Sequence, residues 1–75
     1  MTPKLPRVTA RQVLQALKKR GFAEVRQSGS HVILKNAEGV RVTLPVHAGK
    51  IIHPAILSAI LRDARLSFEE FSSLL

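Results

Sequence analysis

His31 is the residue of this sequence best placed to move a proton. It opens a run of alternating residues, 31–35, whose pattern predicts a β-strand with Val32 and Leu34 on one face. If that apolar face is covered, the imidazole projects from the opposite, open face. An imidazole exchanges protons readily near neutral pH, so His31 can serve as a general base or acid. The alternative is an ordinary solvated surface histidine.

The other two histidines, His47 and His53, follow the predicted strands. Neither has the spacing from a second histidine or a carboxylate that zinc sites use, so we expect no metal and no other cofactor. His47 precedes a glycine and Lys50, where it either lines the same surface as the strand ends or is solvated. His53 precedes Pro54 and is expected to serve the start of a helix. The absence of cysteine excludes disulfides and thiolate chemistry.

Positive charge is the strongest signal in the composition. The sequence holds 12 Lys and Arg against 5 Asp and Glu, and residues 1–50 carry ten of the basic residues and two of the acidic ones. Such a basic surface usually meets a polyanion, most often nucleic acid, although it can also serve solubility alone. Four cations that can contact phosphate groups are expected around His31: Arg26, Lys35, Arg41 and Lys50.

The segment directly before His31 is a candidate phosphate contact. Ser28, Gly29 and Ser30 offer hydroxyl and backbone N–H groups to an anion. A plain turn explains the same residues equally well, because no phosphate-loop motif is present. The sequence has no Trp or Tyr, and its three Phe are expected in the core or at a helix cap, so a platform for stacking single-stranded bases is missing.

A first helix is expected before these residues, at positions 10–20. Thr9 and Gln12 have the spacing of a capping box at its start. Apolar residues then recur at helical spacing, which predicts one buried stripe. Gly21 ends the helix, and the basic residues 18–20 compensate the helix dipole.

Three strands are expected next, at residues 22–27, 31–35 and 40–44. Each is an alternating or apolar run bounded by turn-forming residues, which is typical of an antiparallel sheet. Ala23 and Val25 are expected on one side of the first strand.

A second helix is expected to begin at Pro54, and the capping-box pair Ser67 and Glu70 begins a short closing helix. The apolar stripe of the second helix is predicted to comprise Ile56, Leu57, Ile60, Leu61 and Ala64. The element order predicts an α+β fold, α-β-β-β-α, in which both main helices cover one face of the sheet. We expect one domain over residues 1–75 with a loose leader at residues 1–7, and no membrane span, because no apolar run reaches about 18 residues.

Four segments together form a recognisable pattern: Gly21-Phe22, Arg26-Gln27-Ser28-Gly29-Ser30-His31, residues 42–50 with Pro45, His47, Gly49 and Lys50, and residues 64–67. The pattern resembles the HicA (YcfA-like) family of toxins from about Thr9 to about Phe71. The histidine motif and the proline-histidine-glycine-lysine motif are fairly specific at this spacing. The resemblance implies a fold like that of double-stranded-RNA-binding domains.

The resemblance also implies an activity, namely cleavage of mRNA without a metal by an enzyme that uses one histidine. His31 matches that histidine, so it would be the catalytic residue of an endoribonuclease. The residues expected to contact RNA are then Arg26, Gln27, Ser28, Gly29, Ser30, Lys35, Arg41, His47 and Lys50. A HicB-type antitoxin would cover the active face, so that a cytoplasmic monomer joins a hetero-oligomer when it is neutralised.

The chain departs from the family pattern at three positions. Ala55 and Ile56 stand where the family usually has Gly-Thr, and Arg65 stands where it commonly has Gly. The first change alters the start of the second helix, and the second removes a helix C-cap glycine at a cost of up to about 1 kcal/mol. Two alternatives to an active toxin stay open: a non-catalytic RNA-binding module, and an inactive copy that acts through protein interaction.

Overall fold

The computed structural model describes residues 6–47 and 49–75, and its elements follow the order α-β-β-β-α-α. They are α1 (Ala10–Lys19), β1 (Ala23–Ser28), β2 (His31–Lys35), β3 (Arg41–Pro45), α2 (Pro54–Asp63) and α3 (Phe68–Leu74). The α+β order predicted from the sequence is confirmed. Of the predicted leader, residues 1–5 lie outside the described residues, and residues 6 and 7 have no regular secondary structure.

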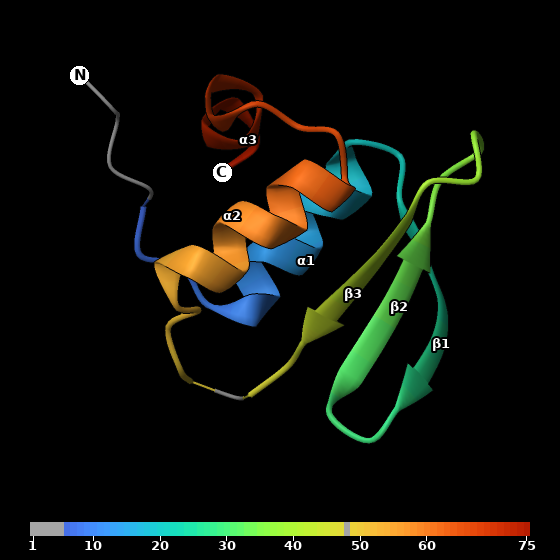
Figure 1. Cartoon of the computed structure of the whole chain (residues 1–75), viewed down its shortest axis with the longest axis horizontal. Helices are drawn as coiled ribbons and strands as arrows, with labels where there is room; N and C mark the ends of the chain where they lie inside the picture. Colours follow the sequence, from blue (N-terminus) through green and yellow to red (C-terminus); the bar gives the residue numbers. More distant parts are fainter. Residues whose placement is uncertain (1–5, 48) are drawn as a thin grey trace.

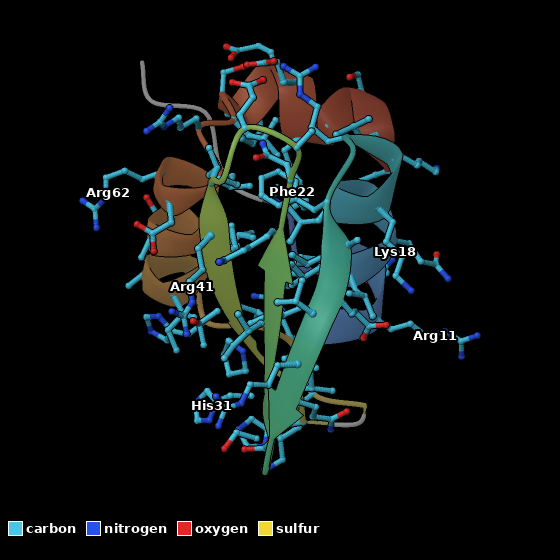
Figure 2. All side chains as sticks on the ribbon, turned by 90° about the vertical axis from the view of Figure 1, so that its right-hand side faces the viewer. Arg11, Lys18, Phe22, His31, Arg41 and Arg62 are labelled. Carbon is cyan, nitrogen blue, oxygen red and sulfur yellow. The ribbon has the colours of Figure 1, made fainter. Side chains whose placement is uncertain are left out.

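The strands form one antiparallel sheet in the order β1-β2-β3. Helices α1 and α2 lie on one face of this sheet (Figure 1), and the other face is open toward the viewer in Figure 2. On the covered face, alternate side chains of β2 and β3 are buried beneath the helices: Val32, Leu34, Val42 and Leu44. The predicted placement of both helices on one face is therefore confirmed.

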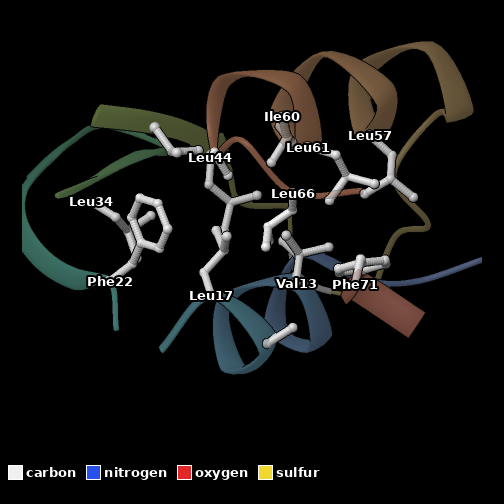
Figure 3. Packing of buried hydrophobic residues seen from close by; sticks show 14 of the residues in the cluster. Val13, Leu17, Phe22, Leu34, Leu44, Leu57, Ile60, Leu61, Leu66 and Phe71 are labelled. Atoms are coloured by element: carbon white, nitrogen blue, oxygen red, sulfur yellow. The ribbon is translucent and has the colours of Figure 1, made fainter. Parts of the chain in front are cut away.

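The helices and the covered face of the sheet share one hydrophobic core. Val13 and Leu17 of α1, Leu57 of α2 and Phe71 of α3 are fully buried and meet in its centre (Figure 3). Among the residues that the structure describes, no polar or charged side chain is buried. Apolar burial therefore holds the fold together, and the residues that could do chemistry lie on the surface.

Capping boxes begin the first and the last helix, as predicted. The hydroxyl of Thr9 accepts the backbone N–H of Gln12, and the Gln12 side chain accepts the N–H of Thr9. Ser67 and Glu70 repeat this exchange at α3. Hydrogen bonds with the backbone N–H and then the side chain of Ser67 hold the pKa of the Glu70 carboxyl below its usual value. Desolvation opposes this lowering, and the charge of Arg20 adds to it. The pair with Arg20 also ties α3 to the end of α1.

Helices α1 and α2 end with the same backbone hydrogen bonds. After α1, the N–H of Phe22 donates to the carbonyl five residues earlier, and the N–H of Gly21 donates to the carbonyl three residues earlier. After α2, the N–H of Leu66 and the N–H of Arg65 form the same two bonds, in that order. This Schellman motif needs a left-handed residue at the position of Gly21 and Arg65, whose φ angles are +99° and +58°. Glycine adopts that conformation freely, whereas an arginine is strained there.

A short pairing links the start of α1 to the loop between β3 and α2. The N–H of Ile52 donates to the carbonyl of Val8 at 2.8 Å, and Thr9 forms an antiparallel bridge with Ile51. Val8 and Ile52 are both buried. This contact anchors the C-terminal end of the loop, which carries two of the predicted site residues.

Strand β1 differs from its prediction. A bulge lies between Glu24 and Arg26, and all six residues of the strand are exposed. The regular alternation expected along this strand therefore stops at Val25, which has no partner in the register, because a bulge adds one residue and shifts every later side chain to the opposite face. Arg26 gains its position on the open face in this way.

Candidate functional site

His31 lies at the end of the sheet away from α3 (Figure 2). Its side chain belongs to the open face, since Val32 is 4% exposed beneath the helices while His31 is exposed. Its direct cross-strand partners are Ser28 on β1 and Pro45 on β3. The predicted position of this imidazole on the open face is confirmed, and a polynucleotide can reach it without any rearrangement of the fold.

A two-residue turn, Gly29 and Ser30, connects β1 to the histidine. The Gln27 side chain donates to the carbonyl of Gly29 at 3.2 Å, and the N–H of Val46 donates to the carbonyl of Ser30 at 2.6 Å. These bonds stabilise the turn and hold the loop after β3 beside it. The hydroxyls of Ser28 and Ser30 form no hydrogen bond with another described residue, so they are available to a ligand.

Arg26 lies diagonally across the sheet from His31. It pairs with Ile33, and Thr43 pairs with Ile33 from the other side. Diagonal neighbours in an antiparallel sheet lie about 7–8 Å apart, which is within reach of a long side chain. Without the bulge after Glu24, Arg26 would point toward the helices. The bulge therefore brings a guanidinium to the face that carries the imidazole.

Lys35 and Arg41 lie at the other end of the open face. They pair directly with each other across β2 and β3, whereas His31 pairs with Pro45. Lys35 follows His31 by four positions, which corresponds to about 13 Å along a strand. The prediction that these two cations surround His31 is therefore wrong for their backbone positions. The cause is the short hairpin at residues 36–40, which sets the first residue of β3 opposite the last residue of β2.

Two groups of cations differ in what they contact. The α1-end cations are Lys18, Lys19 and Arg20, and the open-face cations are Arg26, Lys35 and Arg41. Each α1-end cation has an acceptor: Glu24 at 3.4 Å for Lys18, the carbonyl of Leu74 at 3.0 Å for Lys19, and Glu70 for Arg20. Within residues 6–47 and 49–75, no open-face cation forms a salt bridge. The open-face cations are therefore left to an external anion.

The loop between β3 and α2 brings His47 and Lys50 to the same end of the sheet as His31. Both are exposed, and both line a hollow of about 200 Å³ whose wall includes Pro45, the cross-strand partner of His31. His47 therefore meets both alternatives left open by the sequence, because it lies at the strand ends and is also exposed to solvent. Its ring and the Lys50 ammonium are the further donors at this end of the sheet.

Helix α2 begins beside this hollow. The Nδ1 atom of His53 accepts the N–H of Ala55 at 3.0 Å and caps the helix, which confirms the predicted role of His53 at a helix start. Ile56 was expected in the apolar stripe, but it is 45% exposed and borders the hollow. The apolar residues at positions 57, 60, 61 and 64 already form a complete buried stripe at helical spacing. Ile56 is an additional apolar residue beside that stripe, and this excess is the feature of the sequence that could have indicated its exposure.

The described residues contain no group of three or more His, Cys, Asp or Glu side chains that could hold a metal ion. None of their helices has the length and apolar character needed to cross a membrane.

Two comparisons with known proteins bear on these features. A family model described as the HicA toxin of bacterial toxin–antitoxin systems matches residues 10–66. This range includes α1, the whole sheet, the loop after β3 and α2. A comparison with curated proteins found no match.

Proposed function

The chain belongs to the HicA family of toxins from bacterial toxin–antitoxin systems, and on that premise we propose that it is a metal-independent endoribonuclease that cleaves mRNA. The observation that carries the proposal is an exposed imidazole, His31, on the open face of the sheet, with Arg26 diagonal to it as a cation that forms no salt bridge with the described residues. A general base that is open to a polynucleotide and flanked by phosphate-binding groups is what RNA transesterification needs.

In the proposed reaction, neutral His31 removes the proton from a ribose 2′-hydroxyl. The 2′-oxygen then attacks the adjacent phosphorus, and the bond from phosphorus to the 5′-oxygen breaks. The products are a 2′,3′-cyclic phosphate and a free 5′-hydroxyl, whose oxygen takes a proton from a general acid. His47, Lys50 and water are the candidates for this acid, since both side chains lie at the His31 end of the sheet.

The cations have two roles in this proposal. Arg26, diagonal to His31, stabilises the negative charge that develops on the phosphate oxygens. Lys35 and Arg41 lie too far along the strands for that role, so they hold the RNA backbone on one side of the cleaved bond. The residues of the turn, Gly29 and the hydroxyls of Ser28 and Ser30, complete the contacts to RNA.

Family membership implies an antitoxin partner. We extend this to a HicB-type antitoxin that covers the open face, so that a free monomer becomes part of a hetero-oligomer. An mRNA substrate would set the site of action in the cytoplasm.

A test of the proposed function is incubation of the purified full chain with an end-labelled RNA in EDTA. We expect fragments that end in a cyclic phosphate, and no cleavage of the same RNA with a single 2′-deoxy substitution at the cleaved position. A dependence of cleavage on added Mg²⁺, or cleavage of the deoxy-substituted strand, contradicts the proposed reaction.

One observation favours a second candidate function, a non-catalytic RNA-binding module. His31 is exposed and lines none of the hollows formed by residues 6–47 and 49–75 that are described here, so none of these hollows encloses a reacting phosphate at its ring. This alternative predicts RNA binding that weakens steeply with salt and no cleavage under any condition. The same gel separates the two functions.

A further inference from the structure

An apolar hollow with exposed isoleucines adjoins the proposed active site. Its volume is about 200 Å³, and its rim includes Ile51, which is 52% exposed, and Ile56, which is 45% exposed. A second hollow of about 380 Å³ on the α1 side shares His47 with it and is lined by Leu14 and Val46. Large apolar side chains exposed together around a hollow are typical of a surface that a partner covers.

The hollow touches the strand end that carries His31. Pro45 forms part of its wall and is also the residue paired with His31 across β2 and β3. The bond of 2.6 Å between the N–H of Val46 and the carbonyl of Ser30 holds the loop against the turn before the histidine. A chain seated in the hollow therefore lies beside Pro45, at the strand end that carries the imidazole, and the part of it that extends past Pro45 obstructs a polynucleotide on the open face.

The rim of the hollow carries groups that attract carboxylates. Lys50 and His47 line it, and Arg11 lines the adjoining hollow, while neither lining includes an acidic residue. His53 accepts the N–H of Ala55 through Nδ1, so its neutral ring carries the proton on Nε2 and presents a donor. The occupant that complements this surface has an apolar side chain flanked by Asp or Glu.

The apolar lining favours a protein over RNA as the occupant. The residues of the hollow include no Phe, Tyr or Trp on which a base could stack, and its ring side chains are the imidazoles of His47 and His53. Its volume is also below the roughly 300–1,000 Å³ of pockets that enclose drug-sized ligands, so it suits one side chain better than a small molecule.

We propose that this hollow is the anchor point of the antitoxin, which inserts one large apolar side chain between Ile51 and Ile56 and places neighbouring carboxylates against Lys50 and the two histidines. Binding beside His31 then excludes RNA by occupying the space in front of the open face. The account of neutralisation rests on the proposed function, whereas the docking site rests on the hollow and on the family.

The test compares Ile51→Glu and Ile56→Glu with two control variants, Ser72→Glu and Leu75→Glu. Both control residues are exposed, lie in or directly after α3, and line neither hollow. All four variants lower the net charge equally, so long-range electrostatics cancels in the comparison. The measurement is the Kd of each full-length variant for the antitoxin of the same toxin–antitoxin pair, together with RNA cleavage by the free protein.

We expect both hollow variants to raise the Kd for the antitoxin by about tenfold or more, because anchor residues dominate interface energetics. The control variants should change the Kd by less than about twofold, as surface substitutions away from an interface do. RNA cleavage by the free hollow variants should equal that of the wild type.

Equal losses in all four variants, or no loss in the hollow variants, overturn the proposal. A hollow variant that loses RNA binding but keeps the antitoxin also overturns it and assigns the hollow to RNA. If the wild type cleaves no RNA while the Kd pattern is as expected, the docking site stands and the nuclease falls. Ile51→Ser and Ile56→Ser, with thermal unfolding as a control, replace any variant that fails to fold.

Discussion

The α1-end cations and the open-face cations are alike in charge and exposure but differ in their surroundings. The α1-end cations each contact an acceptor within the chain and join α1 to β1 and α3. The open-face cations have no acidic partner among the described residues, and two of them, Lys35 and Arg41, oppose each other directly. Like charges placed opposite each other cost stability, so this face is arranged for an external anion. Substitutions at the α1 end should therefore alter stability, and substitutions on the open face should alter function.

The largest effect is expected at His31, which shares the open face with these cations. His31→Ala removes the proposed general base and should lower RNA cleavage about 10²–10⁴-fold, because a positioned base contributes that much to rate. RNA affinity and the unfolding midpoint should stay close to those of the wild type. Single-turnover cleavage, an RNA-binding isotherm and thermal unfolding of one preparation measure all three. Unchanged cleavage would reject the role of His31.

The next effect sharpens the contrast between the two groups of cations. The double variant Lys35→Ala with Arg41→Ala should weaken RNA binding and reduce the slope of log K against log salt by about 0.7 for each lost contact to a single strand. It should also unfold at a slightly higher temperature, since a like-charge pair is removed.

The matched control is Lys18→Ala with Lys19→Ala, which changes the net charge by the same amount. Because these side chains already contact acceptors at 3.4 Å and 3.0 Å, we expect a smaller loss of affinity and a loss of stability instead. The same loss of affinity in both double variants would mean that net charge alone governs binding.

A smaller effect is expected at Arg65, a cation outside both groups. Its φ of +58° places it in the left-handed region, which costs a residue with a side chain roughly 1–2 kcal/mol. Arg65→Gly relieves that strain but raises the conformational entropy of the unfolded chain, which favours unfolding. We therefore expect a net gain of about 0.5–1 kcal/mol in the free energy of unfolding. RNA affinity should not change, since the residue follows α2 on the covered side of the sheet. Urea denaturation measures the gain, and destabilisation would show that the arginine makes a compensating contact.

The smallest effect concerns Glu70, which bonds to Ser67 at the start of α3 and pairs with Arg20 at the end of α1. The pKa of Glu70 is lower in the folded protein than in the unfolded chain, so the folded state binds its proton less readily. The stability from this carboxylate is present above the unfolded pKa and is lost as the pH falls through the folded pKa. Glu70→Gln should therefore unfold at a lower temperature than the wild type at neutral pH, and the difference should shrink in acid. If the difference in unfolding temperature between Glu70→Gln and the wild type does not vary with pH, its cause is lost packing rather than the charge of the carboxylate.

Local hydrogen-bond chemistry made much of the fold predictable. The capping pairs at Thr9 and Ser67 and the helix end at Gly21 each involve residues within a few positions of one another, so the sequence contains the whole interaction. Alternation in β2 likewise predicts that His31 lies on the open face, because Val32 and Leu34 occupy the covered face and His31 must point to the opposite one.

Features that depend on distant segments were not predictable in the same way. The bulge after Glu24 reflects how β1 fits against β2, and nothing in the local alternation indicates it. The exposure of Ile56 depends on where the core ends, and the hollow beside it forms only when α1, the loop after β3 and α2 meet. The position of Arg41 is a different matter, since the length of the hairpin already sets it opposite Lys35.

Strand β1 places part of the proposed site on the least protected edge of the sheet. It contributes no buried side chain, and its ladder pairs it with β2 alone. Segments with few buried contacts open locally while the rest of a protein stays folded. The backbone amides of β1 should therefore exchange with solvent faster than those of β2, so that Arg26 and Ser28 can separate from His31 and return without unfolding the core.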